Sequence, residues 1–332
     1  MNRFGKALLN FFKALIIPAI VYVVFLIITG GRFGSLATMT SVVRTASVPL
    51  LIAMGMSLNM SMGMWDFSVG SVVYASAILG ANLTAYFGWG IPGLFLFALL
   101  IGIAMSAFTG FLYNKFRVPS LVLSLGLAIA YEAIPNMIAP NATGMIGILD
   151  GFMAQMPYCL VVIGFMAILL HLIYTYTTFG KRIMAIGANI GIANSAGINL
   201  DKTKFLSFVL GGVFFGLAGA MYMSMNVSVI AVMNFASVSL IFDSMMGVFI
   251  AGLLVKFVPY TLSVVIGVFT IRMLGSALVA CGLSSQMRSV STGFFLLVVL
   301  SISANQTLFT ERKMRKESAS LADKEYHQGI SI

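Results

Sequence analysis

The chain contains a series of apolar runs, each about as long as a helix that crosses a membrane. Such a helix needs about 20 mostly apolar residues to span a hydrocarbon layer about 30 Å thick. Ten runs of this kind begin near Ala14, Val43, Phe67, Ile91, Pro119, Tyr158, Phe205, Ser239, Val258 and Val290. Only 8% of the 332 residues are charged, against about a quarter in a soluble domain. The sequence therefore predicts an all-α, polytopic membrane protein with about ten transmembrane helices, nine or eleven remaining possible because boundaries such as the Trp65-Asp66 break are soft.

The positions of the basic residues predict the orientation, because positively charged loops stay on the cytoplasmic side. With the N-terminus inside, ten alternating spans place 15 of the 19 Lys and Arg residues in the cytoplasm. The four others are Arg32, Arg44, Arg272 and Arg288. We therefore expect both termini to be cytoplasmic. The net charge of +10 is spread over separate loops, which argues against a nucleic-acid partner.

The hydrophilic parts of the chain are too small for a catalytic domain. The longest are a loop over residues 179–204 and a basic tail over residues 307–332, both predicted to be cytoplasmic; residues 1–306 form the predicted transmembrane domain. No phosphate-binding loop occurs, since Gly180-Lys181 is followed by Arg182 and lacks the first glycine of that motif. Cys159 and Cys281 are too far apart for a cysteine ligand motif. We expect no enzyme activity, metal or cofactor on this chain.

Four ionisable residues lie within the predicted spans: Glu132, Asp243, Arg272 and Arg288. An unpaired charge there costs about 2.5–3.5 kcal/mol, so these side chains either form salt bridges with one another or extend to the membrane surface. Small residues four positions apart form two ladders, one of Gly102, Ser106 and Gly110 and one of Gly212 and Gly216. They favour close helix packing within the chain, or alternatively between subunits.

The segment from Gly63 to Ser71 interrupts a hydrophobic tract with two glycines, a charge and hydroxyl groups. Irregular backbone at membrane depth is tolerated where it lines a cavity or is covered by protein. Asp66 is placed to cap a new helix by accepting from the amide of Ser68 or Val69, and contact with a transported solute is an equally good interpretation. Both roles are compatible with a broken helix beside a transport pathway.

These residues resemble the ribose-type permeases of bacterial ABC importers. Met64 to Ser71 resembles their Gly-Ile-Asp-Leu-Ser-Val-Gly-Ser signature, and the likeness runs in the same order from about residue 15 to 305. Three further segments carry it: Arg117-Val118-Pro119 with Ser124-Leu125-Gly126, Gly180 to Ile198, and Ser207 to Met221. The segment Ala251 to Lys256 departs from the family, which usually has glycines there.

The resemblance implies a permease subunit of the bacterial cytoplasmic (inner) membrane, translocating a sugar delivered by an extracellular or periplasmic binding protein. ATP and Mg²⁺ would be bound by partner ATPase subunits. In this family the 179–204 loop carries a short helix that docks on the ATPase, which implicates Asn189, Ala193, Asn194, Gly197 and Ile198. A second permease chain, identical or different, would complete the membrane unit; both possibilities stay open.

Polar and aromatic groups suited to a sugar pathway lie near the interrupted segment and in the neighbouring spans. They are Asn59, Ser61, Trp65, Asp66, Ser68, Ser71, Asn82 and Ser124, although each could instead cap or cross-link helices. A nucleoside or another small polar solute is the alternative cargo. A self-sufficient secondary carrier is the alternative class, and the scarcity of charge near the middle of the spans argues against it.

Overall fold

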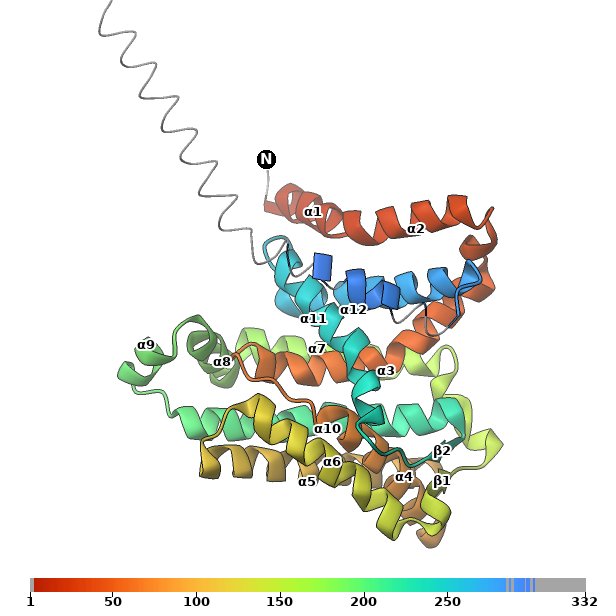
Figure 1. Cartoon of the computed structure of the whole chain (residues 1–332). Helices are drawn as coiled ribbons and strands as arrows, with labels where there is room; N and C mark the ends of the chain where they lie inside the picture. Colours follow the sequence, from red (N-terminus) through yellow and green to blue (C-terminus); the bar gives the residue numbers. More distant parts are fainter. Residues whose placement is uncertain (1–2, 285–286, 288–289, 296, 299–300, 302–332) are drawn as a thin grey trace, which may run out of the picture. The chain divides into compact units, whose positions relative to one another are not determined.

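The computed structural model describes residues 3–284, 287, 290–295, 297–298 and 301, almost all of them in helices (Figure 1). The chain divides into two compact units, residues 1–283 and 284–332. Its α-helices are α1 (Arg3–Ala14), α2 (Ile16–Ile28), α3 (Leu36–Met60), α4 (Val69–Phe87), α5 (Gly90–Phe116), α6 (Ser120–Ile138), α7 (Tyr158–Tyr176), α8 (Thr178–Ala188), α9 (Ile190–Ser195), α10 (Leu200–Asn226), α11 (Ser239–Leu254) and α12 (Tyr260–Ala280). Four 3-10 helices are η1 (Arg32–Gly34), η2 (Pro140–Ala142), η3 (Ile148–Ala154) and η4 (Ala236–Val238).

The helices confirm the predicted all-α membrane fold. Within the described residues, eight helices are long and apolar enough to cross a membrane, namely α3, α4, α5, α6, α7, α10, α11 with η4, and α12. A ninth span is formed if α1 and α2, which are bent by 46° at Leu15, are counted together. These nine match nine of the ten predicted runs. The tenth, beginning near Val290, lies only partly within the described residues, and the 307–332 tail lies outside them.

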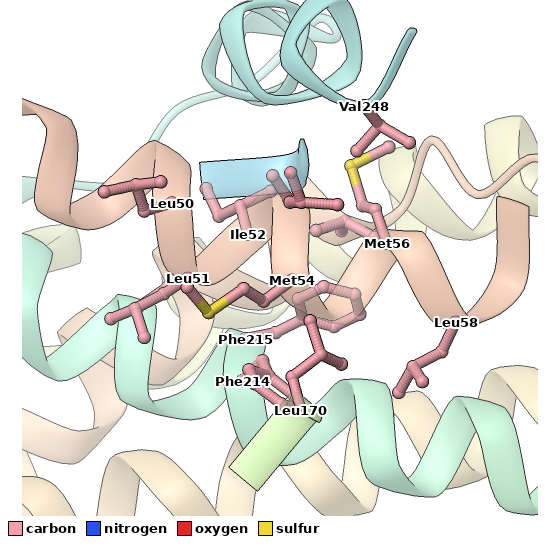
Figure 2. Close-up of a cluster of buried hydrophobic side chains, with 14 of the residues drawn as sticks. Leu50, Leu51, Ile52, Met54, Met56, Leu58, Leu170, Phe214, Phe215 and Val248 are labelled. Carbon is pink, nitrogen blue, oxygen red and sulfur yellow. The ribbon is translucent and has the colours of Figure 1, made fainter. Parts of the chain in front are cut away.

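The centre of the bundle is α3, in which every residue from Ala46 to Asn59 is buried. A helix that is apolar on all sides must be surrounded by other helices or by lipid. Here protein surrounds it: Figure 2 shows Leu51 and Met54 of α3 facing Phe214 and Phe215 of α10, with Leu170 of α7 and Val248 of α11 in the same cluster.

Close glycine contacts join α5 to α10. A methyl group added at Gly102 would lie 2.5 Å from the Cα of Gly216, and one added at Gly212 would lie 2.6 Å from the carbonyl oxygen of Gly102. Gly110 faces the Phe208 side chain in the same way. The two predicted ladders therefore pack against each other inside this chain.

Contacts at the helix ends agree with the predicted alternation of spans. Ser61 after α3 contacts Tyr174 of α7 and Tyr260 of α12, and the Asn114 side chain of α5 donates to the Asp201 backbone at the start of α10. The basic residues of the intervening turns, Arg117, Lys181, Arg182, Lys202 and Lys256, thus belong to one end of the bundle. The assignment of that end to the cytoplasm stays a prediction.

The opposite end carries a two-stranded antiparallel sheet, in which β1 (Thr143–Met145) pairs with β2 (Ser228–Ile230). Gly144 lies opposite Val229 and packs closely on the backbone of Ile78. The sheet ties the α6–α7 connection to the α10–α11 connection beside α4 (Figure 1).

Candidate functional site

A tight turn ends α3 and begins the interrupted segment. Gly63 has a φ of 76°, its amide donates to the Met60 carbonyl over 3.0 Å, and the amide of Met64 donates to the Asn59 carbonyl over 3.1 Å. This pair of hydrogen bonds is the Schellman motif, which requires a left-handed residue and so favours glycine. The turn satisfies the last carbonyls of α3 and leads the chain into an extended stretch before α4 begins at Val69.

Asp66 is buried and hydrogen-bonded to Ser68, the residue directly before α4. Its Oδ1 accepts from the Ser68 amide at 2.9 Å and from the Ser68 hydroxyl at 2.6 Å. The Ser71 hydroxyl donates to the Ser68 carbonyl over 2.7 Å. The predicted hydrogen bond from the Ser68 amide to Asp66 is present, although the N-cap position of α4 is occupied by Ser68 and not by Asp66. Asp66, Ser68 and Ser71 form one buried polar cluster.

Trp65 links the same segment to two other spans. Its amide donates to the Ser120 hydroxyl of α6 over 3.0 Å, and its ring lies 5.5 Å from the Phe249 ring of α11. The Ser124 hydroxyl is 3.5 Å from the Trp65 carbonyl. About a third of the Trp65 side chain is exposed, so this aromatic surface is available to a solute or a second subunit.

The two predicted asparagines lie apart from this cluster and bind other helices. The Oδ1 of Asn59 accepts from the Ser207 hydroxyl of α10 at 2.7 Å, and its buried Nδ2 has no hydrogen-bond partner. Asn82 donates to the carbonyls of Ile78 and Thr143 at 2.9 Å, far along α4 at the end that carries the sheet. Both residues cross-link the bundle, and their role in a pathway stays a prediction.

The 179–204 loop forms two short helices whose first turns are capped by side chains. The Thr177 hydroxyl accepts from the Gly180 amide at 3.0 Å at the start of α8, and Asn189 accepts from the Ile192 amide at 3.0 Å at the start of α9. Asn199 caps α10 in the same way through the Lys202 amide, at 2.9 Å. Such caps each contribute about 1 kcal/mol and give the loop a defined shape.

Helix α9 exposes apolar side chains as well as the polar Asn194 and Ser195. Ile190 and Ile192 are 49% and 69% exposed, although this loop lies at the basic end of the bundle. Of the predicted docking residues, Asn189, Asn194 and Gly197 are exposed, Ile198 is half-buried and Ala193 is only 2% exposed. Ala193 therefore packs α9 onto the bundle, and Ile190 and Ile192, which the resemblance did not indicate, are the large apolar side chains that α9 exposes.

Two of the ionisable residues form the predicted salt bridge. Arg272 Nη1 of α12 lies 2.6 Å from Asp243 Oδ2 of α11. Glu132 instead accepts two backbone hydrogen bonds, from Phe235 and Ser237. Arg288 lies outside the described residues. No group of three His, Cys, Asp or Glu side chains suited to a metal ion occurs in the described part of the chain.

Comparison with known proteins places these features in a family. Residues 38–300, more than half of the chain, match the family described as "Branched-chain amino acid transport system / permease component". The chain is 26% identical over 324 residues to the "Autoinducer 2 import system permease protein LsrC" of Yersinia pseudotuberculosis serotype O:1b (strain IP 31758), covering 95% of this chain and 89% of that protein. The LsrC protein of Yersinia pestis (strain Pestoides F) has the same identity and coverage. No solved structure matches the chain.

Proposed function

Because this chain belongs to the family of branched-chain amino acid transport system permease components, we propose that it is the permease through which an ATP-driven importer moves a sugar-like solute inward. It is a transport subunit and a multi-pass protein of the bacterial cytoplasmic (inner) membrane, of the ABC importer class. Importers of this class work with ATPase and solute-binding partners.

The single observation that best supports ATP-driven transport is the exposed apolar part of the α9 surface. Ile190 and Ile192 project from a capped helix at the end of the bundle where the basic turns gather, and burying such side chains against another protein gains about 1.5–3 kcal/mol each. We assign this surface to a partner ATPase, which binds ATP and Mg²⁺ and closes and reopens as the solute passes.

A sugar or sugar-derived solute is the cargo that best fits the chain. The relatives above are named as permeases of an autoinducer 2 import system. The interrupted segment offers groups that bind neutral polyols, since Trp65 presents an aromatic surface beside the Asp66, Ser68 and Ser71 cluster. An extracellular binding protein would deliver the solute, and a second permease chain, identical or different, would complete the pathway. A nucleoside is the alternative cargo.

Reconstitution tests this function. The chain is co-purified with its ATPase and binding-protein partners, with one tagged and one untagged copy to detect a homodimer, and placed in proteoliposomes. We expect uptake of labelled sugar that requires the binding protein and internal ATP. Full uptake by this chain alone without ATP would overturn the importer and establish a secondary carrier.

A second measurement tests the docking surface. The double variant Ile190→Ala, Ile192→Ala should lose most ATPase co-purification while the chain still inserts into the membrane. The matched control is Leu96→Ala, Leu100→Ala, which removes two exposed apolar side chains from α5 outside the loop. Equal ATPase recovery with both double variants would show that α9 is not the docking helix.

A further inference from the structure

Helix α8 packs on two neighbouring helices through glycine. Gly180 and Gly187 are seven residues apart and so lie on the same face of α8, which also buries Ile183 and Ile186. A methyl group added at Gly180 would collide with the Ile173 carbonyl of α7, and one added at Gly187 would collide with the Ser61 carbonyl after α3. The Gly187 contact is therefore backbone against backbone, with no side chain between.

Ser61 is also fixed from the membrane side by two tyrosines. Its hydroxyl lies 3.0 Å from the Tyr174 hydroxyl of α7 and 3.2 Å from the Tyr260 hydroxyl of α12. Tyr174 in turn donates to the Ser57 carbonyl over 3.0 Å, and the two rings pack edge to face at 4.9 Å. The end of α3 is thus held between α8 on one side and α7 and α12 on the other.

Ser61 also lies two residues before the interrupted segment, which begins at Gly63. Ser61 precedes the Schellman turn at Gly63, and four residues after Ser61, Trp65 contacts Ser120 of α6 and Phe249 of α11. Asp66 and Ser68 follow and lead into α4, which begins at Val69. A displacement of Ser61 therefore acts on a short, hydrogen-bonded stretch of chain that reaches the aromatic and polar groups assigned to the solute.

We propose that Gly187 and Ser61 form the contact through which movement of the α8–α9 loop shifts the Trp65 to Ser68 segment. This proposal rests on the proposed function. It assigns Gly187 and Ser61 as positioning residues between the loop that docks on the ATPase and the segment that contacts the solute. Gly187 is exposed and Ser61 half-buried, but their backbones touch directly. Side chains in a contact can change rotamer and absorb a small movement, whereas two touching backbones transmit it directly. Gly187 is required because any larger residue separates α8 from the Ser61 turn.

The test compares Gly187→Ala with Gly164→Ala, a control in α7 where the added methyl group meets nothing within 4 Å. Both are measured in the reconstituted importer as solute molecules transported per ATP hydrolysed. We expect Gly187→Ala to lower this ratio by about fivefold or more, which is the lower end of typical coupling between two sites, with the ATPase still bound. Gly164→Ala should keep the wild-type ratio.

Trp65 supplies a readout that does not depend on transport. The chain has two tryptophans, so in a Trp89→Phe background the fluorescence of Trp65 reports on the segment alone. ATP added to the assembled complex should change this fluorescence, and Gly187→Ala should abolish the change. If Gly187→Ala does not fold, the complex that carries only Trp89→Phe decides, because ATP must change its Trp65 fluorescence if movement of the loop reaches this segment.

The possible results separate the two proposals. A wild-type ratio and a normal Trp65 response in Gly187→Ala would overturn the Gly187–Ser61 contact while leaving the importer in place. Trp65 fluorescence that does not respond to ATP in a complex with ATP-dependent uptake would overturn it as well. Absence of ATP-dependent uptake in the wild-type complex would instead overturn the proposed function itself.

Discussion

Glu132 of α6 holds the backbone of Ser237, whose amide donates to Glu132 Oε1 over 2.9 Å, while the Phe235 amide donates to Oε2 over 3.0 Å. The carboxylate is buried and faces the start of η4, directly before α11. A negative charge at a helix start accepts from amides that have no partner in the helix. The sequence predicted that the Glu132 charge would form a salt bridge or reach the membrane surface. In the structure it is stabilised by backbone amides instead.

Replacing this carboxylate should destabilise the fold without removing bulk. Glu132→Gln keeps the side-chain shape but puts an NH₂ group where one amide needs an acceptor, and an unpaired buried group costs about 1–3 kcal/mol. We expect a lower apparent midpoint of thermal unfolding in detergent. Asp201→Asn, which removes an exposed carboxylate at the start of α10, is the control and should change the midpoint little.

The interhelical salt bridge gives a second prediction. Arg272→Gln or Asp243→Asn leaves the other charge unpaired within the bundle, at a cost of up to about 3 kcal/mol. The reversed pair, Asp243→Arg with Arg272→Asp, restores opposite charges on α11 and α12 and should recover part of the lost thermal stability. A reversed pair no more stable than either single variant would show that the bridge contributes nothing.

Much of this architecture could be predicted from the sequence, because membrane spans are long and their signal is strong. The runs near Ile91, Pro119, Tyr158 and Ser239 begin within one residue of α5, α6, α7 and α11. The permease family was also predicted and is confirmed. The Asp243–Arg272 salt bridge is one of the two arrangements, salt bridges or side chains that extend to the membrane surface, expected for the ionisable residues. Charged residues within the spans and glycines at four-residue spacing can be read from a single sequence, and therefore such helix contacts can be predicted from it.

Other features could not be predicted, for physical reasons. Strands β1 and β2 have three residues each and come from loops far apart in the sequence, so neither has a detectable alternation. In a membrane protein an apolar residue can face lipid, another helix or a partner. The sequence alone therefore could not separate the buried Ala193 from the exposed Ile192 on the same short helix.

Two glycine substitutions should change the thermal stability in opposite directions, because only one of the two glycines lies at the contact between α5 and α10. Gly102→Ala places a methyl group against the Gly216 backbone, and overpacking of this kind costs about 1–3 kcal/mol. Gly126→Ala in α6 meets nothing within 4 Å and should stabilise the helix by up to about 1 kcal/mol. Apparent unfolding midpoints in detergent should move in opposite directions. If the unfolding midpoint moved in the same direction in both variants, α5 and α10 would not be in close contact at Gly102.

The last prediction concerns Asp66, whose Oδ1 accepts both from the Ser68 amide and from its hydroxyl. If capping is its main role, Asp66→Asn and Asp66→Ser should keep most transport, because both side chains can still accept from that amide. Asp66→Ala should lose about 1 kcal/mol of cap stability, and more because the site is buried. If the charge itself contacts the solute or a partner, all three variants should fail alike. Uptake of labelled sugar by the reconstituted complex, normalised to inserted protein, separates these outcomes, and full transport by Asp66→Ala would contradict both roles.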